Sequence, residues 1–333
     1  MNEIKNIVSD IKNGAVKPIY FLMGEEPYYI DKISDYIEKN ILEESEKGFN
    51  LQVMYGRDVT VDDIVGAAKR YPMMAEKQVI IVKEAQDLSR SIEKLVAYAN
   101  QPQPTTVLVL NYKYKKLDKR KKLHKAIAKT GLVFESKKLY DNKVADWIRR
   151  VLSGKNYQIA PKAAQMLVDF LGTDLSKIAN ELDKLMLILP KETIITDVHI
   201  EENIGISKDF NNFELLKAIG DKNVVKANRI INYFVNNPKN NPTVMTISLL
   251  NNFFTKLLLF HGLENKSKDA VSRALGVNIY FVEDYFFASR NYPMRKVAEV
   301  IAILRDADVK SKGVGANLSQ GDILKELIFK ILH

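Results

Sequence analysis

The order in which apolar patterns follow one another along the chain is the feature that most restricts its fold. Up to about residue 135, short apolar runs such as Ile19–Met23, Val79–Val82 and Thr106–Leu110 alternate with segments of helical period. Continuous apolar runs of this length are typical of parallel strands that helices cover on both faces. From about Asp141 the strand patterns stop, and helical periods continue almost to the end. The sequence therefore predicts an α/β domain followed by an all-α part.

The predicted domain boundaries follow from this change and from a polar stretch near residues 207–212. A chain of 333 residues is long enough for two or three domains. We expect an α/β domain over residues 1–140, a small helical domain over residues 141–209 and a larger helical domain over residues 210–333. In the small domain, the pattern predicts a helix that begins after Asp174 and stops before Pro190.

The composition excludes several classes of protein. The chain has no cysteine, which rules out disulfides, thiolate metal sites and a cysteine nucleophile. Its four histidines lie far apart in the sequence, so we expect no metal site and no cofactor. No apolar run approaches the roughly 20 residues that span a bilayer, and the first residues lack the apolar core of a signal peptide. We expect a cytoplasmic protein with no membrane partner, and the net charge of +9 favours an acidic partner such as nucleic acid.

The turn after the first predicted strand lacks the residues of a phosphate-binding loop. Such a loop ends in Gly-Lys-Ser/Thr, where backbone amides hold the phosphates and the lysine neutralises them. Here the strand leads into Met23-Gly24-Glu25-Glu26-Pro27, which has no second glycine, no lysine followed by a hydroxyl residue, and two carboxylates. The proline also removes one amide donor. We expect no triphosphate to bind at this turn, and we find no catalytic motif elsewhere in the sequence.

Three stretches of the sequence resemble the delta subunits of bacterial DNA polymerase III clamp loaders. Pro18–Ile30 matches the first strand and non-binding loop of that family, Asp174–Leu185 its lid-domain signature, and Leu304–Gly313 a segment of its collar. The resemblance covers nearly the whole chain. It implies a RecA-like, AAA+-type parallel-sheet domain without a functional phosphate loop, then a small helical lid domain, then a helical collar domain that joins subunits in an oligomer.

The same resemblance implies a function. A delta subunit binds the sliding clamp and opens it for loading onto primed DNA, and it is not itself an ATPase. Its collar holds it beside the ATPase subunits and a delta-prime type subunit, and primed DNA lies within the assembled loader. Two alternatives remain open, namely a nucleotide-hydrolysing ATPase that acts on DNA and a plain basic DNA-binding protein. The first requires an intact phosphate loop, and the second predicts tight, salt-sensitive duplex binding without clamp binding.

The position at which this family contacts the clamp falls on Tyr71, Pro72, Met73 and Met74, before the third predicted strand. We expect Pro72 to end a helix and to present the next side chains on a stiff turn, so that little entropy is lost on docking. Burial of each methionine contributes roughly 1.5–3 kcal/mol. Family members often have an aromatic residue at one of these two positions, whereas this chain has two flexible methionines. The alternative is that both methionines fill the bottom of their own domain.

A basic run between residues 113 and 125 is the second candidate site. It contains seven lysines and Arg120 against a single acid, Asp118. Such a patch is suited to the phosphate backbone of DNA, with a marked salt dependence, and it is equally typical of a solvated helix face. The candidate residues are Lys113, Lys115, Lys116, Lys119, Arg120, Lys121, Lys122 and Lys125.

Overall fold

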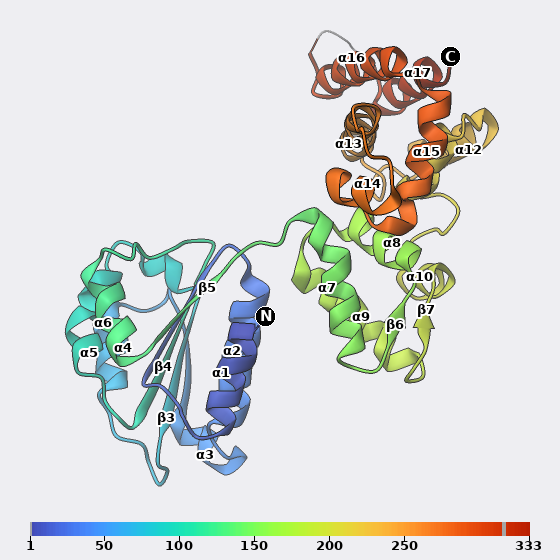
Figure 1. Cartoon of the computed structure of the whole chain (residues 1–333). Coiled ribbons are helices and arrows are strands. Elements are labelled where there is room, and N and C mark those ends of the chain that lie inside the picture. Colours follow the sequence, from blue (N-terminus) through green and yellow to red (C-terminus); the bar gives the residue numbers. More distant parts are fainter. Residues whose placement is uncertain (1, 315–317) are drawn as a thin grey trace. The chain divides into compact units, whose positions relative to one another are not determined.

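A computed structural model describes residues 2–314 and 318–333 of the chain (Figure 1). Contacts between residues divide the chain into two compact units, unit 1 over residues 1–139 and unit 2 over residues 140–333. The further division of the helical part into a lid domain and a collar domain stays a prediction.

Unit 1 is built on a five-stranded parallel sheet with the strand order β2-β3-β4-β1-β5. The strands are β1 (Ile19–Gly24), β2 (Leu51–Tyr55), β3 (Gln78–Lys83), β4 (Thr106–Lys113) and β5 (Leu132–Ser136). Because all five strands run in the same direction, their amino ends lie at one edge of the sheet and their carboxyl ends at the opposite edge. The two edges therefore present different loops, and each loop follows or precedes a known strand.

Helices cover both faces of this sheet, as the continuous apolar strands predict (Figure 1). The helices are α1 (Asn2–Lys12), α2 (Pro27–Asn40), α3 (Glu44–Asn50), α4 (Val61–Ala68), α5 (Val96–Asn100) and α6 (Lys122–Thr130), with the 3-10 turns η1 (Ala85–Leu88) and η2 (Ile92–Leu95). Tyr20 packs on the face that α1 and α2 cover, whereas Phe21 packs on the face that α4, α5 and α6 cover. Alternate residues of a strand point to opposite faces, so successive apolar residues supply two separate cores.

Over its described residues, 140–314 and 318–333, the regular structure of unit 2 is helical apart from one short ladder of strands. Its helices are α7 (Asp141–Ser153), α8 (Pro161–Leu171), α9 (Leu175–Ile188), α10 (Asp197–Ile204), α11 (Asn212–Gly220), α12 (Val224–Asn236), α13 (Thr243–His261), α14 (Lys268–Leu275), α15 (Val282–Asn291), α16 (Met294–Ser311) and α17 (Gln320–Leu332), with the 3-10 turn η3 (Ile279–Phe281). The ladder pairs β6 (Gln158–Ile159) with β7 (Ile194–Ile195) in parallel. The predicted fold class, α/β followed by all-α, is confirmed, although strands do not stop entirely at residue 141 as expected.

The ends of two helices in unit 2 agree with the sequence signals. Asp174 accepts a hydrogen bond from Lys177 N at 3.1 Å and caps the start of α9. The helix ends at Ile188, before Pro190, which cannot donate the hydrogen bond that continuation would require. The predicted helix over this segment is therefore confirmed.

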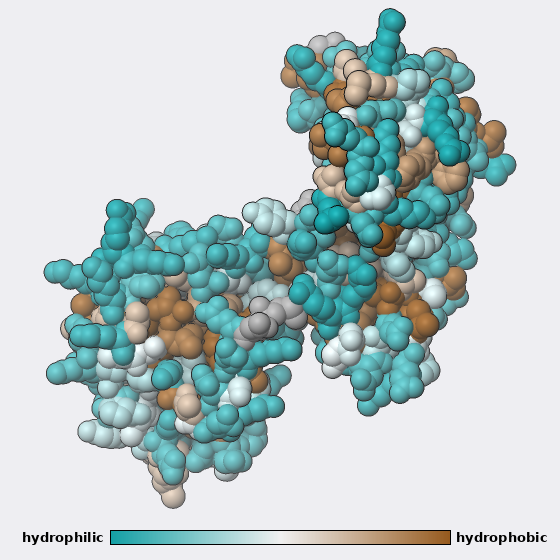
Figure 2. Space-filling view, viewed as in Figure 1, coloured by the Kyte–Doolittle hydropathy of each residue, from teal (hydrophilic) through white to brown (hydrophobic). Residues whose placement is uncertain are grey.

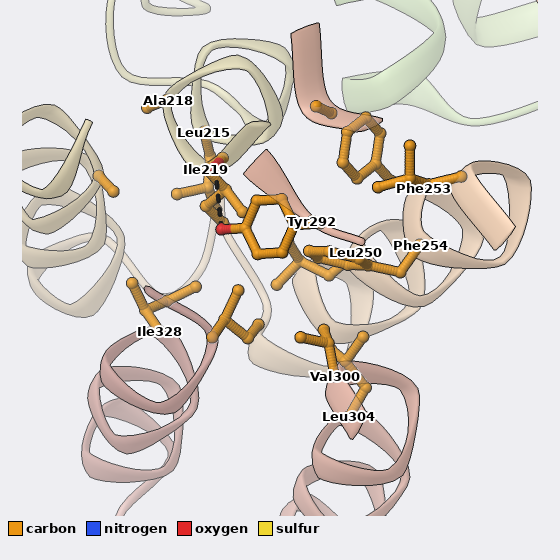
Figure 3. Packing of buried hydrophobic residues seen from close by; sticks show 14 of the residues in the cluster. Leu215, Ala218, Ile219, Leu250, Phe253, Phe254, Tyr292, Val300, Leu304 and Ile328 are labelled. Atoms are coloured by element: carbon orange, nitrogen blue, oxygen red, sulfur yellow. Dashed lines mark hydrogen bonds between the residues drawn. The ribbon is translucent and has the colours of Figure 1, made fainter. Parts of the chain in front are cut away.

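The core of unit 2 gathers side chains from α11 to α17 (Figure 3). Figure 3 shows the Tyr292 hydroxyl directed at Ile219 O, to which it donates a hydrogen bond of 3.0 Å. Among the described helices, α13 alone is long and apolar enough to cross a membrane by length and composition. Leu250 and Phe254 of this helix are fully buried in the core of unit 2.

A group of ion pairs joins the predicted lid segment to the predicted collar segment inside unit 2. Glu214 of α11 is buried and pairs with Lys162 of α8 at 2.8 Å and with Lys226 of α12. Lys162 also pairs with Asp197 of α10 at 3.0 Å. Burial alone would raise the pKa of Glu214, but its hydrogen bonds to the two lysines outweigh burial and hold that pKa below the usual range. Residues from both sides of the predicted boundary at 209/210 therefore share one charged cluster.

Candidate functional site

The segment predicted to contact a sliding clamp forms a loop between α4 and β3, at the edge of the sheet where the strands begin (Figure 1). Helix α4 ends at Ala68, so the expectation that Pro72 ends it was wrong. Buried polar side chains instead bind the last carbonyls of the helical turn. Thr106 Oγ1 donates to Ala68 O at 2.8 Å. Gln78 Nε2 donates to Arg70 O at 2.6 Å, and the base of the loop is thereby fixed to β3 and β4.

This loop turns its apolar side chains toward the solvent. Met74 is fully exposed, Met73 is 60% exposed and Tyr71 is 77% exposed, while Pro72 is partly buried. The alternative that both methionines fill the bottom of their own domain is therefore wrong. Figure 2 shows a surface that is mostly hydrophilic on the face in view. Several large apolar side chains on one protruding loop are typical of a contact surface rather than of an ordinary solvated turn.

The backbone of this loop adopts an unusual conformation that contacts from a neighbouring helix hold in place. Met74 has φ = +53°, in the left-handed region that residues other than glycine seldom adopt. Next to it, the buried side chain of Asn50 accepts a hydrogen bond from Met73 N at 2.7 Å and donates one to Met73 O at 2.9 Å. Asn50 is the last residue of α3, so the loop is joined to a helix 23 residues earlier in the chain.

Phe49 lies beside this junction and was not among the predicted site residues. It directly precedes Asn50 in α3, and its side chain is 77% exposed. The rest of this short helix is polar or glycine, so the signal in the sequence was a single aromatic residue in a polar segment. Exposed aromatic side chains next to an apolar loop can enlarge the area that a partner buries.

The opposite edge of the sheet carries the turn that was predicted not to bind a triphosphate. Gly24 N and Glu25 N donate to backbone carbonyls at 3.1 Å and 2.9 Å. Glu26 Oε1 accepts a hydrogen bond from Tyr28 N at 3.1 Å and caps α2 with a carboxylate. A Cβ on Gly24, where φ is +129°, would lie 2.0 Å from Ser136 O, so this close approach requires glycine. The amides that would bind a phosphate are therefore donated to oxygens of the protein itself.

Lys113 lies at the same edge, at the end of β4, and makes two ion pairs inside the fold. Its Nζ is 2.9 Å from an oxygen of Asp31 and 2.9 Å from an oxygen of Glu84. Burial would lower the pKa of Lys113, but the hydrogen bonds with Glu84 and Asp31 outweigh it and raise that pKa. Burial would likewise raise the pKa of Glu84, and its contacts with Lys113 and Gln86 lower it instead.

Lys116 bridges two further acids beside the closed turn. Its Nζ lies 3.1 Å from Glu25 and 3.1 Å from Glu135. The hydrogen bonds with these two carboxylates raise the pKa of Lys116, and the contact with Lys116 lowers the pKa of Glu135. The sequence alone suggested that Lys113 and Lys116 could contact DNA. In the structure, both lysines neutralise carboxylates of their own domain.

The remaining members of the basic run are divided between paired and unpaired cations. The paired ones are Lys115 with Ser89 Oγ, Lys119 with Glu135, Arg120 with Asp118 and Lys121 with Glu93. Lys122 and Lys125 are exposed on α6 and make no ion pair with any described residue. Of the predicted set, these two have no ion pair or side-chain hydrogen bond with the described residues, while exposed cations in weak pairs, such as Lys119 at 3.9 Å from Glu135, stay accessible as well.

A recess in unit 2 is lined by α8, the segment after α10 and the α12–α13 connection. Asp169 of α8 lies in this recess, where burial raises its pKa to about 6 against the opposing hydrogen bond from Gln165 Nε2 at 2.7 Å. The other lining residues carry apolar, hydroxyl or amide groups, so they supply no second carboxylate for acid–base work. Within residues 2–314 and 318–333, no three histidine, aspartate or glutamate side chains gather closely enough to hold a metal ion.

Comparisons with known proteins give three findings. Residues 20–137 match the family described as DNA polymerase III, delta subunit. The chain is 27% identical over 262 residues to the DNA polymerase III subunit delta of Bacillus subtilis (strain 168), a match that covers 76% of this chain and 75% of that protein. The solved structure of the Bacillus subtilis DNA clamp loader delta protein superposes with a TM-score of 0.55 at 24% identity, over 99% of both chains, and this likeness bears on the fold alone. Together the family match and the curated relative confirm the resemblance that the three sequence stretches indicated.

Proposed function

We propose that this chain, a relative of the bacterial DNA polymerase III delta subunits, is the delta subunit of a clamp loader in the cytoplasm. In this role it binds a sliding clamp and opens it for loading onto primed DNA. Its helical collar holds it beside ATPase subunits and a delta-prime type subunit. The observation that carries the proposal is the exposed loop with Met73 and Met74, which stands on a base fixed by buried hydrogen bonds.

The loop is suited to grip an apolar pocket. Burial of each methionine contributes roughly 1.5–3 kcal/mol, and fixing each side chain costs about 0.5–1.5 kcal/mol. Each methionine therefore contributes about 1–1.5 kcal/mol and the pair about 2–3 kcal/mol to binding, which is the scale of an interface hot spot. Clamp opening follows because the chain binds the open clamp more tightly than the closed one, and the shift is limited to that difference in affinity.

We propose further that the chain hydrolyses no nucleotide itself. Support comes from the turn after β1, whose amides are donated to backbone carbonyls, and from Glu26, which caps α2 where a phosphate would have to lie. A nucleotide-hydrolysing ATPase would need those amides free. Lys122 and Lys125 are the residues of the basic run that we expect to contact DNA within the assembled loader.

The decisive experiment measures binding of the purified full-length chain to its cognate clamp. A Met73→Ser, Met74→Ser double variant should bind about 30-fold more weakly or worse, since 1.4 kcal/mol corresponds to tenfold in affinity. The matched control is Met245→Ser, Met294→Ser, which removes two exposed methionines of unit 2 and should leave affinity unchanged.

The possible outcomes separate the proposal from its rivals. Wild-type chain that does not bind the clamp refutes the proposal. Clamp binding that survives the double variant moves the contact away from this loop. Turnover of ATP above background by the purified chain would instead support the ATPase alternative, and tight duplex binding without clamp binding would support a plain DNA-binding protein.

A further inference from the structure

We infer that Asn50 is a positioning residue, which holds the methionine loop in the conformation that docks. The inference deepens the proposed function and rests on it, because the loop is taken as the clamp contact. It starts from the two hydrogen bonds between one buried side-chain amide and the backbone of Met73, the residue that begins the exposed pair.

The side-chain amide of Asn50 is almost fully used by these contacts. Its oxygen accepts from Met73 N at 2.7 Å, and its nitrogen donates to Met73 O at 2.9 Å and to Glu46 O at 3.1 Å. Asn50 is 3% exposed, so water cannot readily replace a lost partner. A loop that left this conformation would leave buried donors and acceptors unpaired, which is unfavourable. The asparagine therefore selects one loop conformation over the alternatives.

The backbone of Met74 shows what this selection achieves. A methionine at φ = +53° is in a region that is unfavourable for any residue with a Cβ. The Met74 side chain is fully exposed, so packing of that side chain within its own unit does not stabilise the conformation. Hydrogen bonds to neighbouring residues stabilise it instead. Asn50 binds the backbone of Met73, the residue before Met74, and Gln78 binds the carbonyl of Arg70 at the base of the loop. The left-handed residue then directs an apolar side chain into solvent, where a partner can bury it.

The chemistry of this position favours an asparagine. The junction needs one acceptor for Met73 N and one donor for Met73 O, and a side-chain amide supplies both. An aspartate of the same shape would keep the acceptor but would place a carboxylate oxygen against Met73 O. An alanine would remove both bonds. A loop that adopts the docking conformation only a tenth of the time binds tenfold more weakly, since apparent affinity falls with the competent fraction.

The test uses the full-length chain with Asn50→Ala and Asn50→Asp, and Asn40→Ala as the matched control. Asn40 also donates its side-chain amide to a helix carbonyl, Tyr36 O at 2.8 Å, but it is exposed and this hydrogen bond stays within α2. We expect hydrogen exchange of the Met73 amide to be slow in the wild type and faster in both Asn50 variants. We expect clamp affinity to fall about tenfold in both, with no change in the control.

A double-mutant cycle separates positioning from a general structural role. In the Met73→Ser, Met74→Ser background, where the apolar contact is removed and the two loop conformations bind the clamp alike, Asn50→Ala should lose clearly less affinity than in the wild type. An equal loss in both backgrounds overturns the inference, as does wild-type affinity in both Asn50 variants. If Asn50→Ala does not fold, the clamp affinity of Asn50→Asp and the exchange rate of the Met73 amide in the wild type still test the inference. Rapid exchange of that amide would contradict its hydrogen bond to Asn50. A wild-type chain that fails to bind the clamp refutes the proposed function, whereas wild-type binding with unaffected Asn50 variants refutes this inference alone.

Discussion

Replacement of Lys113 by methionine tests the conclusion that the lysine run serves chiefly inside its own domain. The change keeps the length and apolar stem of the side chain and removes the charge. It leaves Asp31 and Glu84 without the cation that lies 2.9 Å from each of them. We expect unit 1 to lose stability, because the carboxylates of Asp31 and Glu84 would then lack a positive charge between them and would repel each other.

The size of this loss follows from the exposure of the three side chains. Lys113 is 13% exposed, while Asp31 and Glu84 are 41% and 36% exposed. Exposed pairs contribute about 0.2–1 kcal/mol, and the loss of one partner from a fully buried pair costs about 3–5 kcal/mol. This cluster lies between the two cases, so we expect Lys113→Met to lower the free energy of unfolding of unit 1 by about 2 kcal/mol.

The loss should depend on pH in a direction that the pKa shifts fix. The pKa of Glu84 is lowered in the fold, so its contribution is present above its unfolded pKa of about 4.3 and disappears as the pH falls through the folded pKa. The pKa of Lys113 is raised, so its contribution is complete below about 10.4 and disappears as the pH rises through the folded pKa. The difference in the free energy of unfolding between wild type and Lys113→Met should therefore be constant from about pH 5 to 10 and become smaller at pH 3.5.

The assay must read unit 1 separately, because the single tryptophan, Trp147, lies in unit 2. Buried Met23 of β1 provides the probe, since peroxide oxidises it only when unit 1 unfolds, and mass spectrometry follows this along a urea series. The control is Lys119→Met, whose lysine is 76% exposed and 3.9 Å from Glu135, and for which we expect less than about 0.5 kcal/mol. Suppose that the two variants lower the free energy of unfolding of unit 1 equally, or that the loss in Lys113→Met is as large at pH 3.5 as at neutral pH. Either result would refute a stabilising role for the ion pairs of Lys113.

Three further predictions concern other residues. Gln78→Leu should destabilise unit 1 by about 2–3 kcal/mol, because it removes the buried donor for Arg70 O, and oxidation of Met23 along a urea series measures it. Asp169→Asn should stabilise unit 2 by about 2–3 kcal/mol at pH 7.5, because the ionised carboxylate is unfavourable in the fold when its pKa is raised from 3.8 to about 6, and by nearly nothing at pH 4, where the carboxyl is protonated in the fold; urea unfolding followed by tryptophan fluorescence measures it. Lys122→Gln with Lys125→Gln should reduce the slope of log affinity for duplex DNA against log salt by ~2, and an unchanged slope would contradict a phosphate contact.

The fold was predictable because its signals are local and repeated. Apolar runs such as Ile19–Met23 are too continuous for a half-exposed strand, and their alternation with helical periods implies a covered parallel sheet. Asp174 and Pro190 marked a helix by capping chemistry that acts within a few residues. The ladder of β6 and β7 was missed because two residues per strand are too short for an alternating pattern to show.

The site was predictable only in part, because its arrangement depends on contacts between distant residues. The resemblance to the delta family pointed to Met73 and Met74 as candidate contact residues. It could not show whether their side chains are exposed or buried, nor that α4 ends at Ala68 before the loop begins. The contact of Asn50 with Met73 spans 23 residues and carries no spacing signal. The lysine run appeared unpaired for the same reason, since Asp31 and Glu84 reach Lys113 from other elements of the fold.

The two edges of the sheet in unit 1 are held by different kinds of contact. At the carboxyl edge, protein oxygens accept the hydrogen bonds of the Gly24 and Glu25 amides, and Lys113 and Lys116 neutralise the acids around them. At the amino edge, the loop with Met73 and Met74 is held outward by contacts that involve no ligand. On the proposed function, subunits that bind and hydrolyse ATP would control clamp binding by covering or uncovering this loop.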